Sequence, residues 1–185
     1  MEKLISNLFL FWIFFGLLPA FANIFNYQYI PAPDWVVRSS LIAKSVGIIS
    51  VLAFLFRLWQ LRSPFSDWGI KAVFSDWGIK AVLVVLFSPF FFFFIGLSVV
   101  TYSVPMVIAM VAGQETEMQF SVVSADGFGS KGCYSTVQLE TPALLDKLCD
   151  VSDSFRKTLD PGDKILLIGR GTTLGLFPAN ARKLD

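Results

Sequence analysis

The sequence predicts a membrane protein with three transmembrane α-helices, followed by a small α+β extracytoplasmic domain with about four antiparallel strands. The first observation is composition: 55% of the residues are hydrophobic and only 16% are charged, whereas soluble domains carry about 25% charged residues. The second is asymmetry, because residues 1–112 hold 11 of the charged side chains and residues 113–185 hold 18. We therefore divide the chain into a membrane region, 1–112, and a periplasmic domain, 113–185.

Three apolar runs of the membrane region are long enough to cross a hydrocarbon core about 30 Å thick, which takes about 20 helical residues. They are residues 4–24, 39–56 and 82–102. The first run ends in Ala20-Phe21-Ala22, which resembles a signal-peptidase site, so a retained span and a cleaved leader both stay open. The uncharged third run continues to Ala112. We predict one span there, with a kink or a new start at Pro105, which lacks an N–H group.

The basic residues of the connecting loops predict the orientation. Residues 57–80 contain two arginines and two lysines, whereas residues 25–38 contain a single arginine, Arg38. The loop richer in positive charge is expected in the cytoplasm, which places the N-terminus inside and the C-terminus in the periplasm of a bacterial inner membrane. Lys44 lies close to the outer end of the second run, where a lysine side chain reaches the lipid head groups.

The loop before the third run contains a perfect tandem repeat. Residues 65–73 read FSDWGIKAV, and residues 74–82 repeat them without a change. Structural repeat arrays use at least about three units and tolerate divergence, so we interpret the repeat as a recent in-frame duplication. The second copy would lead into the third span, and the first would lengthen the cytoplasmic loop. Whether the duplication is tolerated or alters the coupling between spans is left open.

The last 73 residues have the composition and the alternating pattern of a small globular domain. Alternating residues at 118–124 and 133–139 predict a hairpin, and 164–169 and 174–181 predict two further strands, with Pro178 favouring a sheet edge. Thr141-Pro142 and the leucines that follow predict a short helix to about Cys149 or Val151, with residues 152–159 adding a second turn or two.

The two cysteines of the chain, Cys133 and Cys149, both fall in this domain. Because the charge pattern places the domain in an oxidising compartment, we predict a disulfide between them. Such a bond would close a loop of about 16 residues and stabilise the domain by roughly 3 kcal/mol.

Catalytic, cofactor-binding and metal-ligating residues are not evident. The sequence has no histidine, which excludes Ser-His-Asp and Cys-His arrangements, and two separated cysteines do not complete a zinc site. The glycines of Gly169–Gly175 lack the ending of a phosphate-binding loop and predict a hairpin turn. Asp146, Asp150 and Asp153 would share a solvated helix face. A net charge of +1 and the absence of a basic stripe argue against nucleic-acid binding.

These observations favour a non-enzymatic inner-membrane protein that contacts lipid and whose periplasmic domain binds a protein partner or senses the envelope. One alternative is an immunity protein that neutralises an envelope-acting toxin. A second is an accessory subunit of a membrane transporter, although the spans offer few polar residues to line a path. A membrane enzyme that uses carboxylates alone also stays open. The sequence does not identify the partner or the oligomeric state.

Overall fold

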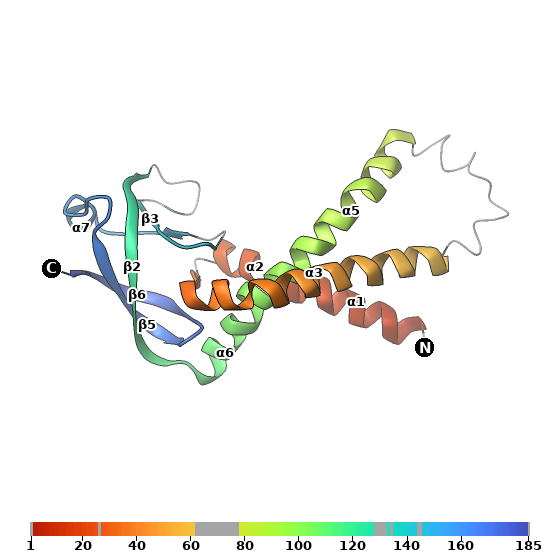
Figure 1. Cartoon of the computed structure of the whole chain (residues 1–185), viewed down its shortest axis with the longest axis horizontal. Helices are drawn as coiled ribbons and strands as arrows, with labels where there is room; N and C mark the ends of the chain where they lie inside the picture. Colours follow the sequence, from red (N-terminus) through yellow and green to blue (C-terminus); the bar gives the residue numbers. More distant parts are fainter. Residues whose placement is uncertain are drawn as a thin grey trace.

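The computed structural model describes residues 2–25, 27–61, 78–127, 133, 135–143 and 146–184. Apolar helices lie at one end of the molecule and an antiparallel sheet lies at the other (Figure 1). The N-terminus, the end of α3 and the start of α5 all lie at the end remote from the sheet (Figure 1). The helical elements are α1 (Glu2–Gly16), α2 (Leu18–Ile24), α3 (Pro33–Leu61), α5 (Gly78–Ser98), the π-helical turn η2 (Val99–Ser103), α6 (Val104–Ala112) and α7 (Asp153–Arg156).

Two helical stretches of the described residues are long and apolar enough to cross a membrane, Pro33–Arg57 and Leu86–Ala112. A third span results if α1 and α2, which meet at an angle of 50°, cross together. The prediction of long apolar helices is therefore confirmed, with two or three possible spans. The second helix extends beyond the predicted 39–56 at both ends, because its polar ends continue the helix past the apolar run.

Of the two outcomes predicted at Pro105, a kink or a new start, the helix makes no new start, since it continues through η2 to Ala112, and it changes type just before the proline. Pro105 cannot donate to the carbonyl one turn before it. The chain widens there into a π turn, in which the Val104 N–H donates to the Val99 carbonyl five residues earlier. The proline therefore changes the helix type locally without ending the helix.

The break between α1 and α2 has a similar cause. Pro19 lies near the start of α2 and has no N–H to donate to the carbonyl of Phe15. That carbonyl instead accepts from the Ser103 hydroxyl at 2.7 Å, and the Gly16 carbonyl accepts from Ser98 at 2.7 Å. An unpaired carbonyl in hydrocarbon costs several kcal/mol, so these two serines stabilise the bend.

Helix α3 buries small residues and exposes large apolar ones, which is the pattern of helix packing in lipid. Its buried positions recur every three or four residues. Gly47 lies against Gly96 of α5, where a Cβ atom added to Gly96 would come within 2.6 Å of the Gly47 Cα. The buried residues are Val36, Ser39, Ala43, Gly47 and Ser50, and the exposed ones include Leu41, Ile42, Ile48, Ile49 and Leu52.

An aromatic cluster joins α1, α3 and α5. The ring centroid of Phe92 lies 5.0 Å from that of Phe9 and 4.3 Å from that of Phe54. Phe92 is buried, whereas Phe90 and Phe94 of the same phenylalanine run are exposed. Lys44 on α3 is exposed as well, so its side chain does not enter the helix interface.

The sheet contains six antiparallel strands in the order β1-β6-β5-β2-β3-β4. The predicted number of about four strands is therefore too low, because β1 and β4 are only two residues long and show no alternation. β1 comes from the loop between α2 and α3, so the sheet takes in residues that precede Gly113. The strands are β1 (Ile30–Pro31), β2 (Gln114–Gly127), β3 (Thr136–Leu139), β4 (Lys147–Leu148), β5 (Lys164–Thr172) and β6 (Gly175–Leu184).

The sheet curls around a single core. β2 pairs with β5 from Gln114 to Ser121, and then with β3 through two register shifts between Val122 and Gly127. Such irregularities bend a strand. All six strands contribute to the core, which consists of Ile30, Phe120, Val122, Ala125, Val137, Leu139, Leu148, Val151, Leu159, Ile165, Leu167 and Leu176.

The predicted helix from Thr141 to Cys149 or Val151 is wrong for the described residues. Lys147 and Leu148 form β4 and pair with Gln138 and Val137. Residues 144 and 145 lie outside the described residues, as do residues 62–77, which hold the first repeat copy and most of the linker before α5. The second copy ends inside α5, which begins at Gly78. Helical structure does occur at 153–156, as a single turn.

Candidate functional site: the seam of the curled sheet

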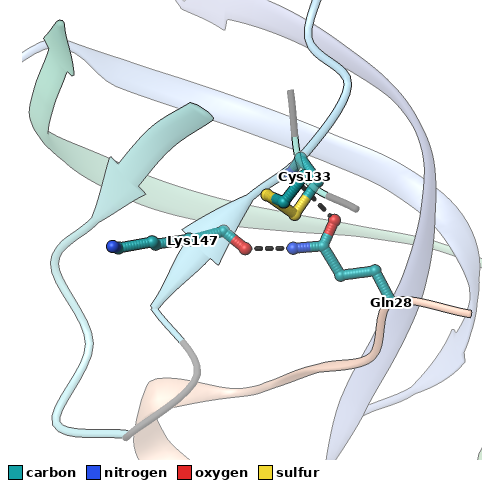
Figure 2. The surroundings of a disulfide bond; sticks show 4 residues. Gln28, Cys133 and Lys147 are labelled. Atoms are coloured by element: carbon teal, nitrogen blue, oxygen red, sulfur yellow. Dashed lines mark hydrogen bonds between the residues drawn. A yellow bond between two sulfur atoms is a disulfide. The ribbon is translucent and has the colours of Figure 1, made fainter. Parts of the chain in front are cut away.

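The two edge strands of the curled sheet are joined by one side chain. Gln28 precedes β1, and its amide group reaches the opposite edge strand, β4. Its Nε2 donates to the Lys147 carbonyl, and its Oε1 accepts from the Cys149 N–H at 3.0 Å (Figure 2). The carboxamide thus forms the pair of bonds that a neighbouring peptide group would form. We call the place where β1 and β6 face β4 across this contact the seam.

The predicted disulfide lies at the seam. Cys133 and Cys149 are bonded, with their Cα atoms 4.9 Å apart, next to the Gln28 amide (Figure 2). Both cysteines are partly exposed. The bond ties the residue after β4 to the segment before β3, so β4 is held by a disulfide, by Gln28 and by its short ladder with β3. This confirms the predicted pairing, and a disulfide suggests an oxidising, extracytoplasmic location.

Backbone strain is concentrated on either side of the disulfide. Ser135 and Asp150 have φ angles of 56° and 55°, and they are the only non-glycine residues with positive φ in the described part of the chain. This conformation costs roughly 1–2 kcal/mol for most L-residues. The Val151 N–H donates to the Ser135 carbonyl at 3.2 Å, which holds the two strained turns together.

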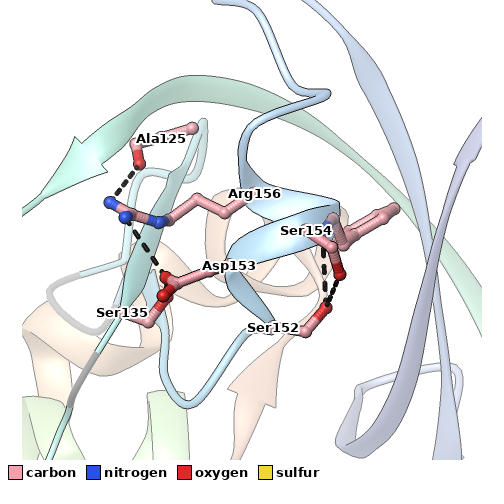
Figure 3. Close-up of polar contacts among 7 residues, drawn as sticks. Ala125, Ser135, Ser152, Asp153, Ser154 and Arg156 are labelled. Atoms are coloured by element: carbon pink, nitrogen blue, oxygen red, sulfur yellow. Dashed lines mark hydrogen bonds and ion pairs between the residues drawn. The ribbon is translucent and has the colours of Figure 1, made fainter.

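An arginine anchors α7 beneath the same turns. Arg156 donates to the Ala125 carbonyl at 3.2 Å and forms an ion pair with Asp153 at 3.3 Å, and Asp153 accepts from the Ser135 hydroxyl (Figure 3). Ser152 caps the helix by accepting from the Phe155 N–H. This network connects β2, the Ser135 turn and α7, and it fixes the wall of the seam opposite β6.

A cavity of about 300 Å³ opens at the seam. The cavity is lined from three places: Gln28 (two residues before β1), the segment from the end of β4 to α7, and the middle of β6. The lining residues are Gln28, Leu148, Cys149, Asp150, Val151, Ser152, Phe155, Pro178, Ala179, Asn180 and Ala181.

The three aspartates predicted on one helix face do not share one, because that helix does not form. Asp146 accepts from the Gln138 amide at 2.8 Å, Asp150 adopts a left-handed turn, and Asp153 pairs with Arg156. Among the described residues no cluster of three or more histidine, cysteine or acidic side chains could hold a metal ion. The predicted turn at Gly169–Gly175 is present, as a tight connection at Thr173 and Leu174.

The sheet domain is fixed to the helices at a second contact. Arg170 of β5 donates to the Met110 carbonyl at 3.1 Å and to the Gly113 carbonyl at 3.2 Å. These carbonyls lie at the end of α6, where a cation is favoured by the helix dipole. Beside it, the rings of Tyr29 and Phe177 meet edge-on at 5.1 Å, and they pack with Ala22, Met106 and Ala109.

Sequence reasoning identified the disulfide but missed Gln28 and Arg170. Neither stands in a recognisable motif, and their partners are backbone atoms 57 to 121 residues away. Comparison with protein families, with characterised proteins and with solved structures found no match to this chain.

Proposed function

We propose that the protein is a non-enzymatic protein of the bacterial inner membrane, with its N-terminus in the cytoplasm and three spans. Its sheet domain lies in the periplasm and binds a protein partner, through which it senses or acts on the envelope. The observation that carries this proposal is the direct attachment of a disulfide-closed sheet to one end of an apolar helix bundle. The orientation rests on the basic residues of the loop between the second and third runs.

The attachment to the helices favours a role in which the domain presents its outer surface to a partner. Arg170 caps α6, β1 joins the loop between α2 and α3 to the sheet, and Gln28 joins that loop to β4. Three connections therefore hold the domain at a defined place on the bundle. A fixed domain pre-organises its outer surface for a partner and lowers the ordering cost of binding.

Site-specific photo-crosslinking in living cells tests partner binding. A benzophenone amino acid is placed at Ala179 beside the seam, at Val123 on the outside of β2 and at Leu41 on the lipid-facing side of α3. We expect a specific protein adduct from at least one sheet position and none from Leu41. The absence of any adduct from the sheet positions would contradict the partner-binding function.

Thiol labelling tests the orientation independently. In a Cys133→Ser/Cys149→Ser background, single cysteines at Ser66 and at Thr173 are exposed to a reagent that does not cross membranes. We expect labelling at position 173 in intact cells, and labelling at position 66 only after the membrane is permeabilised. The reverse pattern would contradict the orientation and the compartment.

A further inference from the structure

Building on the partner-binding function proposed above, we propose that the seam cavity binds an extended peptide segment of the partner. The peptide would pair with the outer edge of β6 at Pro178–Ala181 and carry a basic side chain opposite Asp150. The occupant is thus a short strand from another protein, and the mode is strand addition to a sheet edge.

The edge of β6 already accepts a strand on its outer side. β1 pairs there with β6, through Ile30 opposite Leu176 and Pro31 opposite Gly175. Beyond Leu176 no described strand continues this pairing, although β6 runs on to Leu184 and pairs with β5 on its inner side. Backbone groups along such an edge are a template for another extended chain.

The cavity lies beside the part of this edge that β1 leaves open. Pro178, Ala179, Asn180 and Ala181 form one wall, and the segment from Leu148 to Ser152 forms the other. Gln28 closes the end where β1 diverges from β6 and reaches over to β4. A strand inserted there would continue the pairing of β1 with β6 and fill the opening between the two sheet edges. The cavity volume of about 300 Å³ lies at the lower limit of ligand pockets, which measure about 300–1,000 Å³.

The residues at the outer edge of β6 favour pairing with a short peptide over pairing with a second copy of the chain. Pro178 has no N–H to donate, the register shift between β5 and β6 falls at Ala179, and Arg182 and Lys183 follow. Proline, bulges and charges of this kind hinder the pairing of two long edges. Asp150 is the single charged side chain among the described residues that line the cavity, so a lysine or arginine in the peptide complements it.

The test uses the oxidised full-length protein in lipid nanodiscs. The protein is panned against a phage-displayed library of random decapeptides, and the selected peptides are synthesised with a fluorophore for anisotropy titrations. Ala179→Trp and Asn180→Trp fill the cavity from two exposed positions of β6. Val123→Trp is the matched control, because Val123 is 46% exposed and lies on β2 outside the seam.

We expect the selected peptides to be enriched in one basic residue. Their Kd for the protein should rise at least about tenfold in both Ala179→Trp and Asn180→Trp and stay within about twofold in Val123→Trp. Asp150→Asn should lower the affinity for these peptides about three- to tenfold. Bound peptide should also slow amide exchange at Ala179–Ala181. The proposal is overturned if no peptide binds above a scrambled control, if both filled variants bind as the parent does, or if the selected peptides bind a second site.

The failure of this proposal can be told apart from the failure of the proposed function. A photo-crosslinked partner at Val123, together with peptides insensitive to Ala179→Trp, would overturn the strand-binding cavity alone. Peptides that bind at the seam without any crosslinked partner in cells would support the cavity and contradict the partner-binding function.

Discussion

Gln28 is a residue whose role depends entirely on the fold. Its amide pairs with the backbone of β4 through a donor and an acceptor at once. A carboxamide is the only neutral side chain that offers both groups in the geometry of a peptide unit. It therefore joins the loop between α2 and α3 to the far edge of the sheet without any additional strand.

Replacing Gln28 by alanine should remove both bonds and leave the Cys149 N–H without its partner. We expect the full-length protein in detergent to lose about 1–3 kcal/mol in its free energy of unfolding, measured by chemical denaturation. Gln119→Ala, at an exposed position of β2, is the matched control and should change stability by less than about 0.5 kcal/mol. Equal stability of the Gln28 and Gln119 variants would show that the seam is not held by this side chain.

Asp163 makes the stability of the domain depend on pH. The Asp160 N–H donates to its Oδ2 at 2.7 Å, and Lys183 lies 2.6 Å from the same oxygen. The backbone hydrogen bond from Asp160, followed by the interaction with Lys183, lowers the pKa of Asp163. A carboxyl whose pKa is lower in the folded state stabilises the fold above its unfolded pKa of about 4 and ceases to do so as the pH falls through the folded value.

Asp163→Asn should therefore melt a few degrees below the parent at pH 7. The difference should be constant above about pH 5 and should close as the pH falls below about 4. Thermal melts followed by circular dichroism across this range measure it, with Glu115→Gln at an exposed position of β2 as the control. A difference that persists undiminished at the lowest pH would assign the effect to packing and not to charge.

At the scale of elements, the helices of this protein could be predicted better than its strands. A membrane helix is signalled by about 20 consecutive apolar residues, so the long runs were recognised without tertiary information. The bend between α1 and α2 is not signalled in this way, because it depends on which helix supplies the missing hydrogen bonds. Ser98 and Ser103 look unremarkable in the sequence, and they acquire a role only beside the carbonyls of Phe15 and Gly16.

The segment after Thr141 shows why the short strands were missed. Leu144, Leu145 and Leu148 have helical spacing, and local periodicity favours a helix there. In the structure, Leu148 pairs with Val137, and Cys149 is bonded to Cys133. The disulfide was predicted correctly, but as a link between a strand and a helix. Two residues of strand are too few to produce an alternating pattern, and the same holds for β1.

The crossing of α3 and α5 depends on the absence of a side chain at Gly47. A Cβ atom built at Gly47 lies 2.8 Å from Cδ2 and 3.0 Å from the carbonyl oxygen of Phe93. Gly47→Leu should force the helices apart and cost about 1–3 kcal/mol, as overpacking does. Ser40→Leu adds the same side chain on an exposed face of α3 and should be neutral. Unfolding in a titration with sodium dodecyl sulfate measures both, and equal midpoints would contradict the close crossing.

At the scale of the whole molecule, the two ends differ in structure. One end is a sheet held by a disulfide, by Gln28 and by Arg170, and the other consists of the diverging ends of α1, α3 and α5 (Figure 1). The end of α3 and the start of α5 belong to the second end (Figure 1), and the first repeat copy lies between them in the sequence. A sequence change between α3 and α5 affects the sheet domain only if it alters how α3 and α5 pack against each other.

Deleting residues 65–73 therefore tests whether the duplication acts on the folded protein. The close crossing of Gly47 and Gly96 and the polar contacts of Ser98 and Ser103 are made by residues at least 18 positions away in the sequence from residues 65–73. We expect the deletion to leave the membrane level, the fraction of protein with the Cys133–Cys149 bond and the melting temperature unchanged, the last within about 2 °C. Replacing the same residues by a Gly/Ser linker of equal length is the control for loop length. If the deletion lowered the disulfide fraction or shifted the melt while the linker variant did not, the repeated sequence itself would couple the end of the bundle remote from the sheet to the sheet. The duplication would then be more than a tolerated insertion.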